Sequence, residues 1–120
     1  MPKIAAISLY VDNLDAAVDF YTQQLGFKVS GRPAPVIVEL EHEGVGLVLC
    51  QAERRVPQSY PDGTGTVIGL VSPDVKAACT RLAAAKVALM FEDPQEFPGG
   101  KFIALEDPAG NVIELLEFSR

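Results

Sequence analysis

An internal repeat constrains the fold of this sequence more than any other feature. Two amphipathic helices are predicted, one over residues 14–25 and one over about 75–86, and the apolar stripe of the first maps onto the second. Asn13 is expected to cap the first helix and Gly26 to end it. The segment Ser72-Pro73-Asp74 is expected to open the second helix with a cap, a first-turn proline and an acid favoured by the helix dipole.

One strand candidate precedes each predicted helix and three follow it. The expected strands are 4–11, 27–30, 36–41 and 45–51 in the first half, and 66–71, 88–91, 101–106 and 112–118 in the second. Gly44 and Gly110 mark corresponding turns. Their spacing implies about five extra residues in the second copy, which we place in Asp93–Gly100. The sequence therefore predicts a βαβββ pattern that occurs twice.

The two copies are joined by a segment that lacks strand or helix periodicity. Residues 53–65 contain two prolines and two glycines, which favour a linker, and Tyr60 is the one aromatic residue there. We therefore divide the 120 residues into module one at about 1–52, a linker at about 53–65 and module two at about 66–120, within a single domain. The linker is a natural candidate to cover part of a cavity.

Composition excludes several classes of function. The formal charge of -6 argues against a nucleic-acid surface and mildly favours a neutral or cationic small ligand. No apolar run approaches the ~20 residues of a membrane span, and the N-terminal residues lack the apolar core of a signal peptide. We therefore expect a cytoplasmic protein without membrane partners. Cys50 and Cys79 form neither metal-ligand spacing nor a disulfide framework.

Two motifs resemble a known superfamily. V-D-N-L-D-A-A-V-D-F-Y-T-Q-Q-L-G-F, over 11–27, resembles the opening module of the vicinal oxygen chelate superfamily, and P-G-G-K-F-I-A-L-E-D-P-A-G-N-V-I-E-L-L-E, over 98–117, resembles its closing motif. That superfamily includes glyoxalase I, bleomycin and fosfomycin resistance proteins and extradiol dioxygenases. The resemblance implies an α+β fold in which each βαβββ module is a curled mixed sheet with a helix on its outer face. It also implies two modules around a cavity, and a homodimer.

The resemblance also identifies where a metal ion would be held. Its four ligand positions fall on Ala6, Val48, Val67 and Glu114. Alanine and valine side chains have no lone pair, and a catalytic ion normally needs about three protein ligands. The sole histidine, His42, lies in a predicted turn rather than at a ligand position. We therefore expect no metal cofactor.

The candidate ligand-binding residues follow from strand alternation and from the linker. Side chains two apart share a face, so Ser8 and Tyr10 are expected on the cavity side of the first strand, together with Ala6. Cys50 shares the corresponding face with Val48. The complete set of candidate ligand contacts is Ser8, Tyr10, Cys50, Tyr60 and Glu114.

Two functional readings stay open at this point. The first is a metal-independent small-molecule-binding protein of the glyoxalase and bleomycin-resistance type. The alternative is an enzyme, a lyase, isomerase or dioxygenase-like protein, which either uses an unusual metal ligand set or uses Glu114 as a metal-free catalytic base. Glu114 has its own two interpretations: a carboxylate that pairs with a nearby donor, or one that contacts the ligand.

Overall fold

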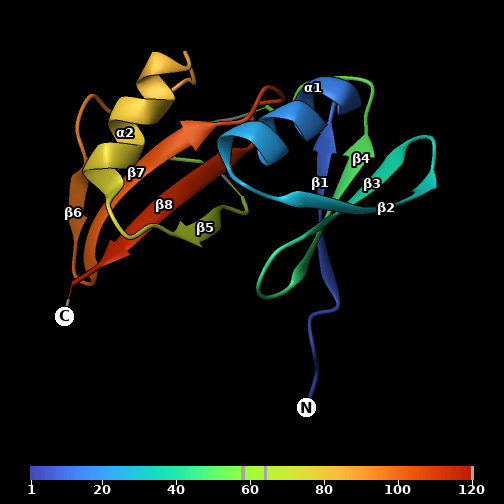
Figure 1. Cartoon of the computed structure of the whole chain (residues 1–120), viewed down its shortest axis with the longest axis horizontal. Helices are drawn as coiled ribbons and strands as arrows, with labels where there is room; N and C mark the ends of the chain where they lie inside the picture. Colours follow the sequence, from blue (N-terminus) through green and yellow to red (C-terminus); the bar gives the residue numbers. More distant parts are fainter. Residues whose placement is uncertain (58, 64, 120) are drawn as a thin grey trace. The chain divides into compact units, whose positions relative to one another are not determined.

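The computed structural model describes residues 1–57, 59–63 and 65–119. The chain forms two compact units, Met1–Pro57 and Gln58–Arg120, each with its own sheet and helix (Figure 1). The boundary between the units falls inside the predicted linker. Residues 58 and 64 of that linker lie outside the described residues.

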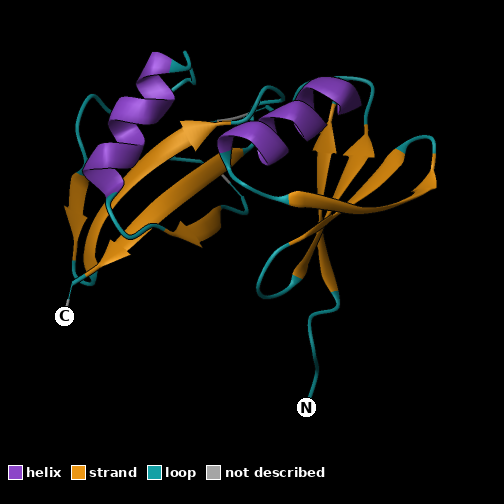
Figure 2. Cartoon of the chain, viewed as in Figure 1, coloured by secondary structure: helices purple, strands orange, loops and turns teal. Residues whose placement is uncertain are grey.

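The first unit is a four-stranded mixed sheet with a helix on one face (Figure 2). Its strands are β1 (Ala6–Val11), β2 (Lys28–Ala34), β3 (Ile37–Glu41) and β4 (Gly46–Gln51), in the order β1-β4-β3-β2. β1 and β4 are parallel, and the other neighbours are antiparallel. The helix α1 (Leu14–Asp19) continues as a π-helical turn, η1 (Phe20–Gln24), so the predicted helical span is present in two geometries.

The second unit repeats this topology. β5 (Ile68–Val71), α2 (Val75–Ala84), β6 (Gln95–Phe97), β7 (Gly100–Glu106) and β8 (Val112–Phe118) form a sheet in the order β5-β8-β7-β6. β5 and β8 are parallel, as β1 and β4 are. The predicted α+β class and the doubled βαβββ pattern are confirmed. In the described part of the chain, none of the helices is long and apolar enough to cross a bilayer.

Each helix begins at a side-chain cap. The Asn13 side chain accepts a hydrogen bond from the Ala16 amide at 3.1 Å, as predicted. In the second unit the cap is Asp74, which accepts from the Ala77 amide at 3.0 Å, so the prediction of Ser72 as the cap is wrong. Ser72 is instead buried, and its amide donates to the Leu116 carbonyl in continuation of the β5–β8 pairing.

The last strand of each unit also reaches the start of its helix. The Gln51 side-chain oxygen accepts from the Leu14 amide at 3.1 Å, and the Glu117 carboxylate accepts from the Val75 amide at 2.8 Å. Both amides belong to the first helical turn, whose donors lack partners within the helix. The two acceptors occupy equivalent places in the repeat, which shows that the correspondence extends to individual hydrogen bonds.

Alternation along the strands separates a helix-covered face from an open face. In β1, Leu9 and Val11 are buried, whereas Ser8 and Tyr10 are exposed, which agrees with the predicted parity. The buried core of the second unit includes Val75 and Leu82 of α2 and the helix-side residues of β7 and β8. Cys79 is buried on α2, as expected of a core cysteine.

One strand prediction is wrong. Residues 88–91 form only an isolated bridge, between Leu89 and Leu105, and the strand equivalent to β2 is β6 at Gln95–Phe97. In the first unit, Ala34 of β2 pairs with Ile37 of β3, which lies three positions later in the chain. In the equivalent pair of the second unit, Gln95 of β6 pairs with Phe102 of β7, which lies seven positions later. The hairpin between β6 and β7 is therefore four residues longer than its counterpart. This places most of the predicted five-residue insertion inside Asp93–Gly100, as expected.

The turn before each final strand is fixed by side-chain hydrogen bonds. Asp107, only 3% exposed, accepts from the amides of Ala109 and Asn111 at 2.9 and 2.8 Å, and its other oxygen accepts from the Asn111 side chain at 2.9 Å. In the first unit, exposed His42 binds the carbonyls of Glu43 and Val45. Gly44 and Gly110 both have positive φ, which explains glycine at these two turns.

Candidate functional site

The open face of the second sheet carries the clearest candidate site. Residues paired across strands share a face, so the register defines this surface in rows. Ala104, Glu114 and Gly69 form one row. The next two rows toward the C-terminal end of β8 are Gln95, Phe102, Leu116 and Val71, then Phe97, Gly100 and Phe118.

Glu114 lies on the middle strand of this surface, where it meets Tyr60. The Tyr60 hydroxyl donates a hydrogen bond of 2.7 Å to the Glu114 carboxylate, and both residues are half-buried. The neighbours of Glu114 in its own row, Gly69 and Ala104, have little or no side chain to cover it. The carboxylate is therefore held by a phenol and flanked in its row by two residues that cannot donate to it from a side chain.

The pairing changes the acidity of the phenol. Burial, together with the hydrogen bond and the negative charge of Glu114, raises the pKa of Tyr60 to about 12. Tyr60 thus remains a protonated donor over the whole physiological pH range. It can orient the carboxylate or share it with a ligand, and a charged acceptor makes this hydrogen bond stronger than a neutral one.

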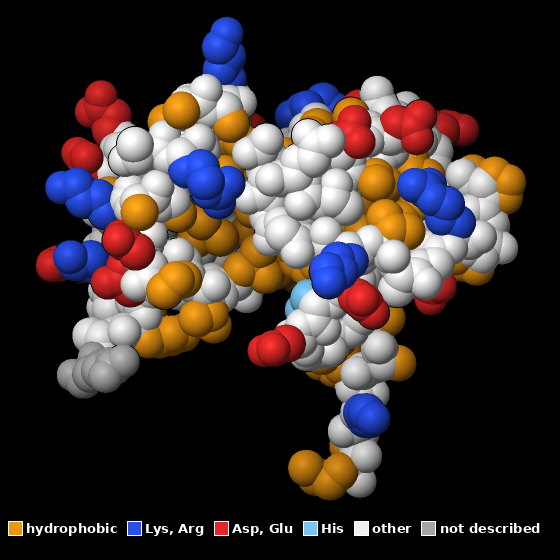
Figure 3. Space-filling model, in the orientation of Figure 1, with side chains coloured by type: hydrophobic (Ala, Val, Ile, Leu, Met, Phe, Trp, Pro, Cys, Tyr) orange, Lys and Arg blue, Asp and Glu red, His pale blue; other side chains and the backbone are white. Residues whose placement is uncertain are grey.

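Aromatic side chains continue from Tyr60 across the unit, and we call them the aromatic strip: Tyr60, Phe91, Phe102, Phe97 and Phe118. Successive rings meet edge to face, with centroids 5.9–6.4 Å apart. Phe118 is 53% exposed and Val71 beside the strip is 78% exposed. Figure 3 shows apolar side chains at the surface of this unit where β5 and the end of β8 lie.

Two hollows lie in the second unit. One, of about 530 Å³, is formed by the end of α2 and residues 87–92, and includes Phe91. The other, of about 370 Å³, lies at the β6–β7 hairpin and is lined mainly by Glu96, Lys101 and Glu117, whose row faces away from the strip. Both volumes fall within the range of ligand pockets, about 300–1,000 Å³.

The candidate residues of the first unit lie on the open face of its own sheet. Ser8 pairs with Val48, and Tyr10 pairs with Cys50, so these four side chains occupy adjacent rows. Ser8 and Tyr10 are exposed, and Cys50 is a half-buried free thiol. Val48 also pairs with Glu39, an exposed acid that the sequence interpretation passed over. Of the predicted site residues, the structure thus brings together Tyr60 with Glu114, and Tyr10 with Cys50.

The residues around Glu114 do not fit a metal ion. Its neighbours across the sheet, Gly69 and Ala104, offer no ligand atom, and Val67 precedes β5 without a donor side chain. Among the described residues, no three His, Cys, Asp or Glu side chains group closely enough to hold an ion. Three protein ligands are the usual minimum for a catalytic zinc.

Sequence reasoning missed the aromatic strip. Phe102 and Phe118 could have been assigned to the face of Glu114 by counting in twos along the predicted strands. Phe97 could not, because the strand that carries it was predicted elsewhere. Phe91 was assigned to a strand that does not form.

Comparison with known families gives one match that spans nearly the whole chain. The family model described as the Glyoxalase/Bleomycin resistance protein/Dioxygenase superfamily matches residues 3–115. A comparison with curated proteins found no match.

Solved structures share the fold. A glyoxalase/bleomycin resistance protein/dioxygenase from Nocardioides superposes with a TM-score of 0.75 at 24% identity, covering 98% of this chain and 84% of that one. An antibiotic-binding protein from a Streptomyces species gives a TM-score of 0.73 at 26% identity, covering 99% and 98%. Glyoxalase I of Leishmania major gives 0.72 at 23% identity, covering 98% and 87%.

Proposed function

The chain belongs to the Glyoxalase/Bleomycin resistance protein/Dioxygenase superfamily, and within it we propose that the protein binds a small organic ligand without a metal cofactor. The ligand would lie against an open sheet face that is apolar with a few polar contacts, the usual composition of a small-molecule site. Ser8, Tyr10, Cys50, Tyr60 and Glu114 are the proposed contacts.

The observation that carries this proposal is the hydrogen bond between Tyr60 and Glu114. A carboxylate held at 2.7 Å by a phenol, beside half-buried aromatic rings, is an acceptor that is already oriented before a ligand binds. A fixed acceptor loses little conformational entropy on binding. The structural similarity to an antibiotic-binding protein at 26% identity supports the same class of function.

Equilibrium dialysis against a panel of hydrophobic, aromatic and cationic compounds tests the proposal. We expect at least one compound to bind equally well before and after treatment of the protein with a chelator. Absence of any binder, together with metal-dependent turnover, would contradict it. Because the chain contains no tryptophan, binding should be followed by dialysis or calorimetry rather than by tryptophan fluorescence.

The variant Glu114→Gln separates a role in binding from a role in folding. A glutamine oxygen can still accept from Tyr60, so the free energy of unfolding should change little. Affinity for a cationic ligand should fall by about 1–3 kcal/mol, the scale of a hydrogen bond to a charged group, and affinity for a neutral ligand should fall less. The control is Glu53→Gln, which makes the same change at an exposed position in the linker. A steep drop in melting temperature with unchanged binding would make Glu114 a structural residue.

One observation favours an enzyme as a second candidate. A phenol and a carboxylate 2.7 Å apart could act as proton donor and base in a lyase or isomerase reaction, with Glu114 as the base. Metal analysis of protein purified without chelator addresses the metal-dependent form of this candidate, since stoichiometric zinc, nickel, manganese or iron would support it. Turnover that persists in chelator and disappears in Glu114→Gln would support the metal-free form.

We also propose that the protein is a cytoplasmic homodimer. Two-fold dimers are the commonest symmetric assemblies, and paired chains are expected from the family resemblance. Light scattering at micromolar concentration should give twice the mass of 12.9 kDa. A monomer mass would contradict this part of the proposal.

A further inference from the structure

We propose that the aromatic strip is a ring-binding surface, and that the ligand of Glu114 carries a positive charge joined to a planar aromatic ring system. This inference rests on the proposed function and specifies the class of ligand. Its basis is the arrangement of side chains on the open face of the second sheet.

The strip and the carboxylate lie along one strand. Glu114, Leu116 and Phe118 are alternate residues of β8, so all three face the same side. Alternate residues are roughly 7 Å apart along a strand, which places the Leu116 row about 7 Å and the Phe118 row about 13 Å from Glu114. A ligand with a charged group over Glu114 would therefore extend its rings over Phe102 and then over Phe97 and Phe118.

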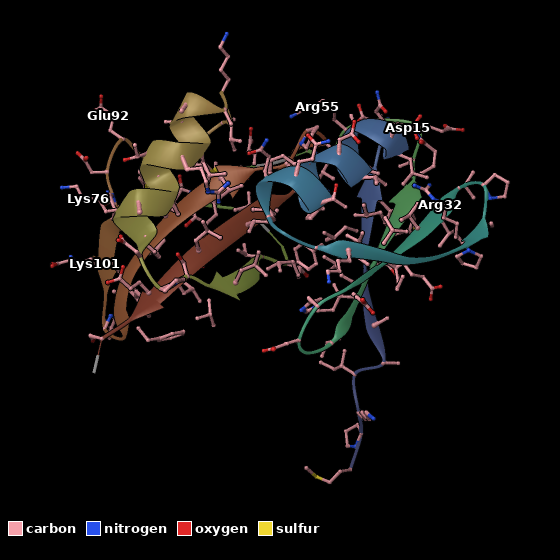
Figure 4. All side chains as sticks on the ribbon, viewed as in Figure 1. Asp15, Arg32, Arg55, Lys76, Glu92 and Lys101 are labelled. Carbon is pink, nitrogen blue, oxygen red and sulfur yellow. The ribbon has the colours of Figure 1, made fainter. Side chains whose placement is uncertain are left out.

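The charges on this face favour a cation. Among the described residues that the register pairs on this face there are two acids, Glu106 and Glu114, and no lysine or arginine. Two basic side chains of this unit point elsewhere: Lys101 shares the opposite face with Ile103, and Figure 4 shows Lys76 and Lys101 extending outward from the ribbon. Complementary charge is the simplest reason for an acid on an otherwise apolar surface.

Rings rather than aliphatic chains suit the rest of the surface. Aromatic pairs gain about 0.5–1.5 kcal/mol beyond the apolar area that they bury, and ring faces also attract cations. The five residues of the strip are contiguous, so a ring system could contact several of them at once.

Three probes with matched shapes test the inference by protein NMR at millimolar probe concentration, where weak binding is measurable. They are 1-naphthylmethylammonium, which has charge and ring, 1-naphthylmethanol, which has the ring alone, and cyclohexylmethylammonium, which has charge without an aromatic ring. We expect the first to bind most tightly and to shift the amide signals of β8. The variants are Phe118→Leu and Phe102→Leu, with Val36→Ala as the control, since Val36 is a similarly exposed apolar residue (52%) of the first unit.

The expected pattern separates ring from charge. Each Phe→Leu variant should weaken both naphthalene probes by about two- to tenfold and leave cyclohexylmethylammonium unchanged. Glu114→Gln should weaken both ammonium probes and spare 1-naphthylmethanol. Melting curves of both Phe variants, one exposed and one half-buried, establish that the protein stays folded.

Three results would overturn the inference. If the ammonium probes bind through Glu114 while the Phe variants change nothing, the strip is not a ring site and the proposed function stands. Equal affinity for the charged and neutral naphthalenes would remove the cation from the ligand class. If none of the probes shifts β8, the ligand class is wrong, and the compound panel described above decides the proposed function independently.

Discussion

The two units share strand order, helix placement and capping hydrogen bonds, but their open faces differ. In the first sheet the central row is Ser8, Val48 and Glu39, with the acid on β3. In the second sheet the equivalent row is Gly69, Glu114 and Ala104, with the acid on the middle strand. The two units therefore share the features that folding needs, whereas their open faces differ in which strand carries the carboxylate.

The longer β6–β7 hairpin accounts for much of that difference. The four additional residues extend β6 and β7 past the end of their counterparts and create the row of Phe97, Gly100 and Phe118. The first sheet ends at the pairing of Ala34 with Ile37 and lacks this row. An insertion in a hairpin can thus add an apolar row to one copy of a repeat without changing its topology.

The largest expected effect concerns Gly100, which pairs with Phe97 at the turn of that extension. Gly100 has a φ of 151°, and a Cβ there would come 2.0 Å from the Glu117 carbonyl oxygen. Gly100→Ala should therefore destabilise the second unit by about 3–5 kcal/mol through overlap and backbone strain. Gly65→Ala is the control, because a Cβ at that position meets nothing within 4 Å. Urea unfolding that showed equal stability for the two variants would mean that the hairpin can shift to accept a side chain.

A somewhat smaller effect is expected at the turns. Asp107→Ala should lower the free energy of unfolding by about 2–4 kcal/mol, because it leaves the amides of Ala109 and Asn111 without their carboxylate acceptor in a buried turn. His42→Ala, at the exposed turn of the first unit, should have an effect of about 1 kcal/mol or less. Denaturant titrations of both variants measure these two losses in the free energy of unfolding. A larger loss for His42→Ala than for Asp107→Ala would contradict the prediction.

Gln51 and Glu117, which accept hydrogen bonds from the first turn of each helix, should differ by less in their contributions to stability. Glu117→Ala removes a charged acceptor from the Val75 amide and should destabilise by about 1.5–3 kcal/mol. Gln51→Ala removes a neutral acceptor from the Leu14 amide, and about 0.5–1.5 kcal/mol is expected. Hydrogen exchange at Val75 and Leu14 should rise selectively in the corresponding variant. Unchanged protection in either would show that another group replaces the acceptor.

The smallest effect is one of pH and concerns Tyr60. Because the folded pKa of Tyr60 is raised to about 12 from an ordinary 10, its contribution to stability is complete below pH 10 and is lost as pH rises toward 12. The melting temperature of the wild type should therefore fall further between pH 10 and 12 than that of Tyr60→Phe. Parallel declines in the two proteins would contradict the raised pKa.

The sequence predicted most of the fold because the signals were local. Residues 112–118 were predicted as a strand with the bounds that β8 has, since their apolar run is flanked by a strong turn. The cap at Asp74 was missed because Ser72 is an equally good capping residue in sequence, and only the pairing of Ser72 with β8 decides between them. Residues 88–91 were predicted as a strand because their apolar composition is that of one, but their backbone makes only a single bridge.

The site was less predictable, because its contacts join distant parts of the chain. Tyr60 and Glu114 were both named as candidates, yet 54 positions separate them, and nothing in the sequence indicates that their side chains meet. Phe97 reaches Phe118 only because the hairpin extension sets a new register. Alternation assigns a side chain to a face, whereas the lengths of loops decide which side chains become neighbours.

The hydrogen bonds from Gln51 and Glu117 also bear on how each unit folds. They span 37 and 42 positions, so the start of each helix is completed by the strand that ends the same unit. Such long-range closure raises contact order, and it makes helix and sheet formation depend on each other rather than proceed in sequence. A chain cut just before residue 117 would retain every residue of α2 and yet leave its first turn without this acceptor. The same cut would spare the first unit, so partial synthesis or proteolysis near that point should yield a molecule with one complete and one incomplete half.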